Sequence, residues 1–431
     1  MIPILKWKSL AAEKKEKILL RAQSETEKIF PQIIPWIEKV KKFGDKAIVE
    51  CTRKFDDPDF SVEKIIVTKQ EIERAIQKVD QEVLQAIEKQ IEISSKFHQT
   101  AYEKICKKWE IENIPGVKTG AKITPMDSCG LWVPAGKAPL PTVAQILTVA
   151  AAAAKVPKIC VAFPPTGEHS EIIAAAHLAG AHHIFRSSGT AAIAAFTFGT
   201  KSIPAVCKIA GPGNPFVQTA KLAVSGMVGI DMFAGPSEAF ILADDSARPD
   251  FLAAEILARC EHGPDSTAVL ATDSEKLAQK VADEIEKQFP KISRQKFTKE
   301  AMKNGFSAIL LFDNQKEIID FANDFAAEHL QISTKNSDKL AEKIRNAGSV
   351  FIGEFSTVPI GDYASGTNHA LPTSRSVKFS SPVGVETFLK TVEFQKLTKE
   401  GLQNLWPIVE KITAVEGLDA HCKSVKIRIE S

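Results

Sequence analysis

The stretch ICVAFPPTGEHSEIIAAAHLAGAHHIFRSS, residues 159–188, decides the fold because it spells out a strand, a helix and a second strand. The apolar run 159–163 ends at a proline and glycine turn, residues 171–179 are helical, and residues 184–187 form the next strand. Working outward, the same unit continues with a helix at 191–198 and a strand at 206–209. Strands separated by helices in this way predict a parallel sheet with right-handed crossovers.

The second half of the chain repeats this pattern. We expect strands at residues 240–243, 269–271, 309–312 and 350–352. We expect helices at residues 250–260, 274–289, 316–324 and 339–347. The two halves together predict an α/β fold with two doubly wound, Rossmann-like parallel sheets.

The regions outside the two sheets have a different pattern. Residues 10–42 are helical and strongly charged, with breaks expected at Pro31 and Pro35. Residues 61–67 are a strand candidate, and residues 69–97 predict one long amphipathic helix. After Pro372 the pattern dissolves, until a helix begins near residue 399 and runs to about residue 415.

A chain of 431 residues exceeds what one core usually supports, so we expect more than one domain. We divide it into an N-terminal helical segment (1–42), a discontinuous α/β domain (43–126 and 237–378), an inserted α/β domain (127–236) and a C-terminal extension (379–431). We place one boundary at residues 231–236. An extension of this length needs a surface to lie on, and a partner copy of the chain is one candidate.

Composition excludes several classes of protein. A net charge of +2, from 55 basic and 53 acidic residues, provides no field that would recruit nucleic acid or an anionic membrane. No apolar run approaches the length of a membrane-spanning helix. The seven cysteines are scattered without a Cys-x-x-Cys pair, which favours a reducing compartment over a disulfide framework. We therefore expect a cytoplasmic protein.

Glu328 and His329 stand where a helical pattern stops and the short apolar run Leu330–Ile332 begins. This position puts both side chains at the mouth of a sheet, where α/β enzymes keep their chemistry. Free carboxyl and imidazole groups have pKa values of about 4.3 and about 6.5, so the pair could move two different protons near neutral pH. His169 and His262 also follow a glutamate, and the former reads as a solvated turn.

Three further segments concentrate polar groups of the kinds that bind metals or substrates: residues 261–266, 361–369 and 416–421. Imidazoles and carboxylates from separate segments are what a zinc site with nitrogen and oxygen ligands needs, although His262 could equally cap a helix. Two small-residue turns, residues 187–190 and 211–214, each follow a strand and open a helix. Such turns bind phosphate groups or simply start helices, and neither has the G-x-G-x-x-G pattern.

Taken together, these segments resemble the histidinol dehydrogenase family from about residue 40 to the end of the chain. The resemblance is carried by these segments: VKKFGDKAIVECTRKFD (40–56), GLWVPAGKAPLP (130–141), AGPGN (210–214), DMFAGPSE (231–238), CEHGPDS (260–266), AAEHL (326–330), GDYASGTNHALPT (361–373) and EGLDAH (416–421). It implies an NAD-dependent enzyme, homodimeric with a shared active site, that oxidises an amino alcohol through its aldehyde to histidine. The inserted domain 127–236 would be the NAD side.

The resemblance also implies roles for individual residues. His329 would be the general base of the alcohol oxidation, and Glu328 would activate the water that hydrates the aldehyde. His262, Asp362 and His421 match zinc ligands that hold the substrate's nitrogen atoms, with His421 supplied by the partner subunit. Other matching positions are Ser237, His369 and Glu416 in the substrate pocket and Asn214 at the cofactor.

Several positions depart from the family pattern. Arg259 stands where the family has a glutamine zinc ligand, and a guanidinium has no lone pair to give a metal. Trp132 replaces a tyrosine that contacts the cofactor and is expected to stack in its place. Ala191 replaces a cofactor-contacting glutamine, with the loss of a hydrogen bond worth about 1 kcal/mol. Ala327 stands for a proline, and Ala135-Gly136 stands for a glycine pair.

Three hypotheses are open at this point. In the first, the chain oxidises histidinol and retains three zinc ligands, with Arg259 turned aside toward an acid. In the second, it is a paralogue that oxidises an anionic alcohol, with Arg259 binding a carboxylate or sulfonate and zinc weakened or absent. In the third, it is an inactive family member that binds a small ligand or a partner.

Overall fold

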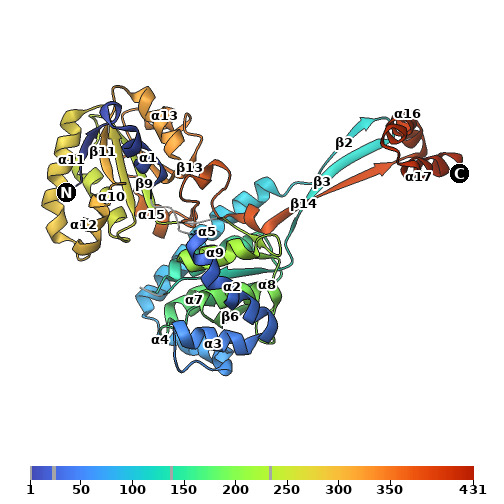
Figure 1. Ribbon diagram of the computed structural model, residues 1–431, viewed down its shortest axis with the longest axis horizontal. Coiled ribbons are helices and arrows are strands. Elements are labelled where there is room, and N and C mark those ends of the chain that lie inside the picture. The colour runs from blue at the N-terminus through green and yellow to red at the C-terminus, as the bar shows by residue number, and fades with distance from the viewer. Residues whose placement is uncertain (1, 22–25, 136–138, 233–234) are drawn as a thin grey trace.

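The computed structural model describes residues 2–21, 26–135, 139–232 and 235–431, which form three sheets and the helices around them. Two α/β units make up the body, and an arm extends from it, ending in the two C-terminal helices (Figure 1). None of the helices in the described ranges combines the length and the apolar character needed to cross a membrane.

Sheet A of the first unit has six parallel strands in the order β1-β11-β10-β9-β12-β13. Its strands are β1 (Ile4–Lys6), β9 (Glu238–Ala243), β10 (Thr267–Thr272), β11 (Ala308–Leu311), β12 (Ala327–Ser333) and β13 (Ala347–Ile352). One face is covered by α10 (Pro249–Cys260), α11 (Glu275–Gln288) and α12 (Gln295–Lys303), and the other by α1 (Ala12–Leu20), α13 (Gln315–Phe325) and α14 (Ser337–Ala341). Alternate residues of β9 enter the two cores, Ile241 on one face and Phe240 on the other.

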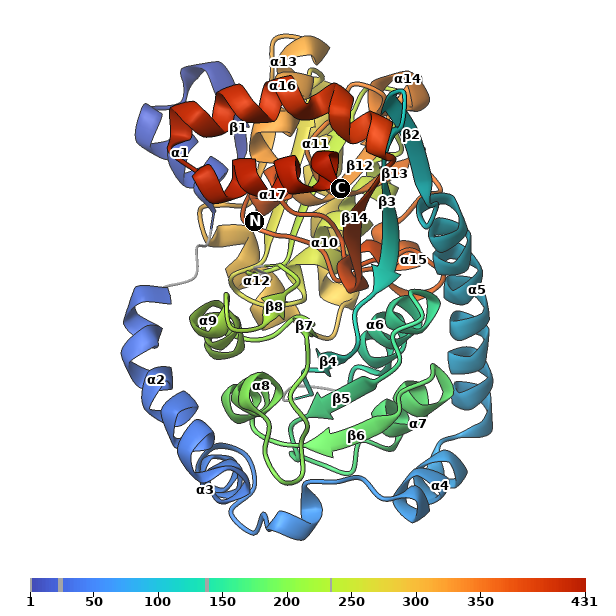
Figure 2. The ribbon, with the colours of Figure 1, turned by 90° about the vertical axis from the view of Figure 1, so that its right-hand side faces the viewer.

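Sheet B of the second unit has five parallel strands in the order β6-β5-β4-β7-β8. Its strands are β4 (Cys129–Trp132), β5 (Ile159–Phe163), β6 (His183–Arg186), β7 (Lys208–Ala210) and β8 (Gly229–Ile230). Its first face packs on α4 (Lys69–Lys78), α5 (Gln81–Ile105), α6 (Pro141–Ala153) and α7 (Ser170–Leu178), and its second on α2 (Thr26–Phe43), α3 (Asp45–Phe55), α8 (Gly189–Phe198) and α9 (Pro215–Val224). In Figure 2, α2 and α5 run along opposite flanks of this unit.

The prediction of an α/β fold with two doubly wound parallel sheets is confirmed. Every strand expected between residues 159 and 352 is present in one of the two sheets, with ends displaced by a few residues. The buried apolar runs identified these strands because both of their faces are covered by helices.

The N-terminal region departs from the expected helical segment. Residues Ile4–Lys6 form β1, which pairs with β11 at the edge of sheet A, whereas α2 belongs to the core around sheet B. Pro31 and Pro35 lie inside α2 without ending it. The buried stripe that includes Ile33 and Ile37 keeps this helix together, since packing outweighs the hydrogen bonds that proline removes.

Residues 43–126 were expected to share a core with residues 237–378, but their helices α3, α4 and α5 pack around sheet B. The helix expected at 69–97 is two helices, because Asp80 caps the start of α5 by accepting from the N–H groups of Glu82 and Val83. In place of the strand expected at 61–67 there is a 3-10 helix, Val62–Lys64. The helix expected at 339–347 ends at Ala341. Of the boundary expected at 231–236, positions 233 and 234 lie outside the described residues.

The helix expected from about residue 399 to 415 is present, but the arm to which it belongs was not expected from the sequence. It is an antiparallel sheet of β2 (Trp109–Ile114), β3 (Val117–Pro125) and β14 (Leu389–Leu397), followed by α16 (Lys399–Glu416) and α17 (Asp419–Glu430). The outer strands β2 and β14 are largely exposed, so they lack the continuous apolar run that marks a buried strand. The remaining short helices are α15 (Val358–Tyr363) and 3-10 turns at Trp7–Ser9, Phe289–Lys291, Ser376–Lys378 and Val385–Phe388.

The segment that follows β13 joins the two units. The carbonyl oxygen of Tyr363, the last residue of α15, accepts a hydrogen bond of 2.6 Å from Gln90 of α5. A little further along, Ala370 enters the core around sheet B. This segment therefore holds the amino ends of the strands of sheet A close to helices that cover sheet B.

Candidate active site

Glu328 and His329 are the second and third residues of β12 and are both buried. We expected them just before a strand, at the mouth of a sheet, and they lie inside the strand at its amino end. The carboxyl ends of parallel strands are the usual site of chemistry in α/β folds. In sheet A, by contrast, these two residues lie at the amino ends of the strands. The neighbouring strand β9 begins there too, with Ser237 immediately before it.

The Glu328 carboxylate is held by groups at the start of β9. Its Oε2 atom accepts hydrogen bonds from the backbone N–H of Glu238 at 2.9 Å and from the hydroxyl of Ser237 at 3.2 Å. Burial opposes ionisation, but His329, Arg259 and the Glu238 N–H outweigh it and lower the pKa of Glu328. Glu328 is therefore an oriented carboxylate that is ionised at neutral pH.

The contacts of the His329 ring define which nitrogen carries the hydrogen. Nδ1 lies 3.1 Å from the carbonyl oxygen of Glu238 and 3.3 Å from Oε2 of Glu328, and both atoms can only accept. Nδ1 is therefore the donor, and Nε2 is the atom that can take or release a proton. Nε2 lies 3.3 Å from Oδ1 of Asp362, without hydrogen-bond geometry.

The pKa of His329 reflects two opposing influences. Burial and the charge of Arg259 lower it, whereas Glu328 and Asp362 raise it, and the balance is a pKa of about 9. At neutral pH the imidazole is thus mostly protonated and paired with two carboxylates. The His329 ring loses its proton and can act as a base when the pH rises to about 9.

Asp362 comes from α15, which begins behind the N-cap residue Thr357. The start of α15 is also held by Glu255 of α10, which accepts from the N–H of Val358 at 3.3 Å. Burial opposes the charge of Asp362, but His329 and Arg259 lower its pKa to about 2. Burial raises the pKa of Glu255 to about 7, partly offset by Val358 and Arg259.

Arg259 reaches the same point from the last turn of α10, and its side chain is 4% exposed. Nη1 donates to the hydroxyl of Ser237, and Nη2 lies 3.8 Å from Oδ2 of Asp362. One guanidinium therefore bridges the serine that holds Glu328 and the aspartate beside His329.

Two further histidines stand around this centre. His262 follows α10 and is partly open to solvent, and its removal from water together with the charge of Arg259 lowers its pKa. His369 is half-buried, and burial lowers its pKa against the opposing effect of Asp362. A backbone hydrogen bond with Thr142 ties His369 to the start of α6. Both imidazoles are neutral near pH 7.

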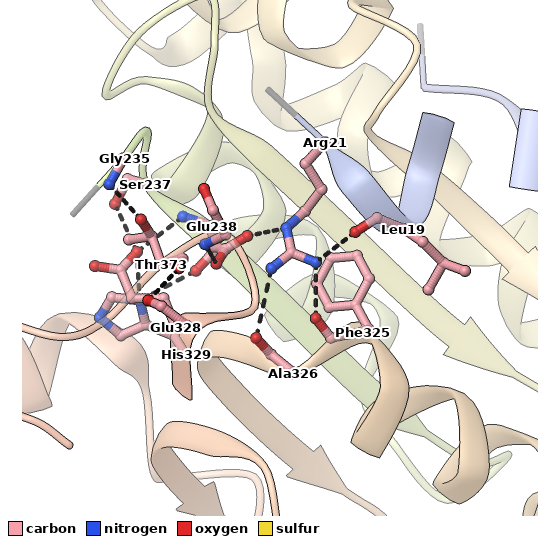
Figure 3. Close-up of polar contacts among 12 residues, drawn as sticks. Leu19, Arg21, Gly235, Ser237, Glu238, Phe325, Ala326, Glu328, His329 and Thr373 are labelled. Carbon is pink, nitrogen blue, oxygen red and sulfur yellow. Dashed lines mark hydrogen bonds and ion pairs between the residues drawn. The ribbon is translucent and has the colours of Figure 1, made fainter. Parts of the chain in front are cut away.

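Sequence reasoning missed the residues that support Glu328 and His329 from below. Glu238 is buried and forms an ion pair with Arg21, while its Oε1 accepts from the N–H of Ser374 at 2.8 Å (Figure 3). A signal was present, because a charged residue opening the buried strand EAFILA requires a buried partner of opposite charge. The sequence contained nothing to identify Arg21 as that partner.

The residues expected at the cofactor lie at the carboxyl edge of sheet B. Asn214 is exposed and caps α9, with its side-chain oxygen 3.0 Å from the N–H of Val217. Ala191 in α8 and Trp132 at the end of β4 are buried in the core, so the Trp132 ring presents little surface on which a ligand could stack. The turn before Asn214 is fixed by Asp231, which accepts from the N–H of Gly211 at 2.7 Å and pairs with the buried Lys221.

Glu416 and His421 are not brought to this centre within one chain. Glu416 ends α16, and His421 lies in α17, at the tip of the arm and away from the body (Figure 1). Both residues are exposed. The other expected residues of the reaction centre, Ser237, Arg259, Glu328, His329 and Asp362, are joined by the contacts described above.

Comparison with known proteins gives a consistent result. The sequence profile of the histidinol dehydrogenase family matches residues 19–429. The chain belongs to the histidinol dehydrogenase family. A histidinol dehydrogenase from Methanocaldococcus jannaschii is 40% identical over 430 residues, 99% of each chain. One from Vibrio parahaemolyticus is 39% identical over 428 residues, 98% of this chain and 97% of the relative.

A solved structure extends this likeness to the coordinates. The crystal structure of histidinol dehydrogenase from Elizabethkingia anophelis matches with a TM-score of 0.93 at 35% identity, covering 100% of this chain and 98% of the other. Histidinol dehydrogenases are NAD-dependent oxidoreductases that act on a CH–OH group, and the family normally binds zinc.

The residues at the reaction centre do not fit a zinc ion. Within the described parts of one isolated chain, which lacks any ligand that a second copy would supply, no group of three or more His, Cys, Asp or Glu side chains is arranged to hold a metal. Of the expected ligands, His262 and Asp362 are near the centre, and His421 is on the arm. The position of the fourth ligand holds Arg259, which cannot coordinate and turns its positive charge toward Asp362.

Proposed function

We propose that this chain acts on histidinol, the substrate named in the names of its relatives, and oxidises it to histidine in two NAD-dependent steps. The observation that carries the proposal is the arrangement of His329, whose Nδ1 is committed to Glu238 while Nε2 is left for a substrate proton. The buried carboxylate of Glu328 lies beside it.

In the first step, His329 Nε2 takes the proton of the primary alcohol. One C–H bond breaks at the same carbon, and NAD supplies the acceptor for the departing hydride. The products are the aldehyde, NADH and a proton on the imidazole. The carbonyl of Glu238 keeps the ring oriented throughout, and Glu328 and Asp362 stabilise the imidazolium that forms.

In the second step, water adds to the aldehyde while the protonated His329 returns its proton to the aldehyde oxygen, which gives a geminal diol. His329 then takes a hydroxyl proton of the diol as a second hydride leaves this carbon for NAD. Glu328 removes a proton from the attacking water, and its two donors, Ser237 and the Glu238 N–H, hold the carboxylate in place. The sum of both steps is one carboxylic acid and two NADH for each alcohol. Burial of the centre keeps the intermediate aldehyde from escaping into solvent.

The proposed cofactor site is the carboxyl edge of sheet B. The turn before Asn214 is partly buried and leads to the exposed start of α9, and the buried pair of Lys221 and Asp231 fixes its shape. Asn214 would contact the cofactor there. We assign no stacking contact to Trp132 and no hydrogen bond to Ala191, because the first is buried and the second is apolar.

We further propose a homodimer in which the arm of one chain reaches the site of the other. Exposed apolar side chains gather on the arm, including Trp109, Ile111, Ile408, Ile412 and Val415, and such a surface favours burial by a partner. A second copy would bring Glu416 and His421 to the substrate pocket. Isologous pairing of two arms would complete two sites at once.

The alternative of an anionic alcohol is not favoured. Arg259 would have to offer its guanidinium to a substrate carboxylate or sulfonate, but Nη1 is already bonded to Ser237 and Nη2 faces Asp362. The alternative of an inactive binding protein is not favoured either, since the general base and its orienting groups are assembled.

The test is the stoichiometry of the reaction. With limiting L-histidinol and excess NAD, we expect about two NADH for each histidinol consumed, and histidine as the product by mass spectrometry. His329→Asn should lose the first oxidation, whereas His177→Asn, the same change at an exposed residue of α7, should not. Turnover of a sulfonate- or carboxylate-bearing alcohol without turnover of histidinol would overturn the proposal.

A further inference from the structure

The positive charge of Arg259 lies close to two buried carboxylates that require a counter-charge. Asp362 and Glu328 are both largely removed from solvent. Nη2 of Arg259 lies 3.8 Å from Oδ2 of Asp362, and its Nη1 donates to Ser237, whose hydroxyl in turn donates to Glu328. A cation at this point offsets the cost of holding two carboxylates together in a buried site.

The guanidinium is also fixed in position. The Arg259 side chain extends from the last turn of α10 and is 4% exposed, and the hydroxyl of Ser237 accepts a hydrogen bond from its Nη1. Its Nε has no hydrogen-bond partner among the described residues, so a buried N–H donor remains for an acceptor that the chain itself does not supply. An alcohol oxygen or a neutral imidazole nitrogen is an acceptor of this kind.

A dication could not share this position with Arg259. The carboxylate of Asp362 that would bind the metal already faces the guanidinium, and two cations bound by the same carboxylate repel each other. Arginine does not lose its proton in proteins, so it cannot relieve that repulsion by becoming neutral.

We propose that Arg259 replaces the metal ion in this chain, which therefore works as a zinc-independent dehydrogenase with a guanidinium as its fixed electrophilic group. This inference rests on the proposed function and extends it. Arg259 neutralises Asp362 and Glu328, and its remaining Nε–H donor orients the substrate through an acceptor atom. The general base remains His329.

The metal content of the protein is the decisive measurement, and it requires no activity. The full-length chain is incubated with zinc chloride, freed of loose metal by gel filtration and analysed by mass spectrometry of the metal. We expect far less than one zinc per chain in the wild type, and about one per chain in Arg259→Gln, where a neutral amide oxygen can coordinate. Arg248→Gln, an exposed arginine at the other end of the same helix, should bind no more zinc than the wild type.

A further variant shows where the metal binds, and a folding measurement controls for misfolded protein. His262→Asn added to Arg259→Gln should remove the zinc gained, and circular dichroism checks that each variant is folded. In activity assays, a chelator should change the wild-type rate by less than about twofold and lower the rate of Arg259→Gln by more than about tenfold. A wild-type chain that holds one zinc, lost in His262→Asn, would overturn the inference even if histidinol is oxidised as proposed. If histidinol is not oxidised, the metal content still decides the inference.

Discussion

The guanidinium of Arg21, from the N-terminal segment, forms a buried ion pair with the carboxylate of Glu238, whose backbone contacts Glu328 and His329. Arg21 also donates to the carbonyl oxygens of Leu19 at 3.0 Å and Phe325 at 2.7 Å, and it stacks 4.0 Å above the Phe325 ring. The backbone of Glu238 donates to Glu328 and accepts from His329 (Figure 3). A segment far from the active site in sequence thus supports it through one carboxylate.

Arg21→Met should be strongly destabilising because it leaves Glu238 buried without its counter-charge. Removing one partner of a buried ion pair costs about 3 to 5 kcal/mol, and urea denaturation at neutral pH measures this loss. The pKa of Glu238 is already raised, chiefly by burial, and removing Arg21 raises it further. A carboxyl group whose folded pKa is raised loses stability as the pH rises above its unfolded pKa, so the loss should be larger at about pH 8 than at about pH 5.

Glu238→Gln serves as the matched variant for this pair. It removes the same ion pair but leaves Arg21 with the carbonyl groups of Leu19 and Phe325 and with the Phe325 ring. We expect a smaller loss than in Arg21→Met. Equal losses in the two variants would show that the buried carboxylate is not the source of the destabilisation.

The pH dependence of the first oxidation should report the state of His329. A base acts in its deprotonated form, and the pKa of His329 is raised to about 9 by Glu328 and Asp362 against burial and Arg259. The value of kcat/KM for histidinol should therefore rise with pH and level off above about pH 9. His329→Asn should lower kcat by about 10²- to 10⁴-fold and abolish this rise. An unchanged pH profile in that variant would refute the assignment of the base.

Glu328→Gln should separate the two oxidations. The amide keeps the shape of the side chain but cannot accept a proton from water, so oxidation of the aldehyde should slow by about 10²-fold or more. The first oxidation should be affected much less. NADH would then form at about one equivalent per histidinol in the fast phase, compared with two for the wild type and for the exposed control Glu73→Gln. Two rapid equivalents from Glu328→Gln would contradict this role.

Sequence reasoning succeeded where a single local signal decided the structure. Strands such as Ile159–Phe163 are buried on both faces, so their apolar runs stand out. The pair Glu328 and His329 could be singled out because its residue types suit proton transfer. Arg21 could not, since its meaning depends on a partner in another element, and one arginine in a charged segment resembles any other. The arm was hidden for a related reason: Trp109 and Ile111 alternate with polar residues, and their burial needs a surface outside the chain.

A substitution at the junction between the arm strands and α16 should displace the arm helices without altering the body of the chain. Gly401 in the first turn of α16 lies against the β2–β3 turn, and a Cβ at this position would lie 3.0 Å from the Cα of Gly116 and closer still to its carbonyl. Gly401→Val should therefore push α16 and α17 away, and we expect a loss of dimer by analytical ultracentrifugation and of activity by about tenfold or more. Gly226→Ala is the steric control: its Cβ would meet no atom within 4 Å, so any loss in this variant reports only the backbone strain of a side chain at its φ of +95°. A Gly401→Val chain that stays dimeric and fully active would contradict the proposed role of the arm.

Mixing two inactive variants should test whether the site is shared between chains. His329→Asn damages the body of the site, and His421→Asn damages the arm, which lies away from its own body (Figure 1). In a mixed dimer, the intact body of the His421→Asn chain can meet the intact arm of the His329→Asn chain, so one of the two sites is complete. After random exchange of subunits half the dimers are mixed, and activity should recover to about a quarter of the wild-type value. Recovery requires both proteins in one solution and dissociation of the parent dimers, which mild denaturant followed by dilution provides. If each chain used its own arm, no mixture of the two variants would regain activity.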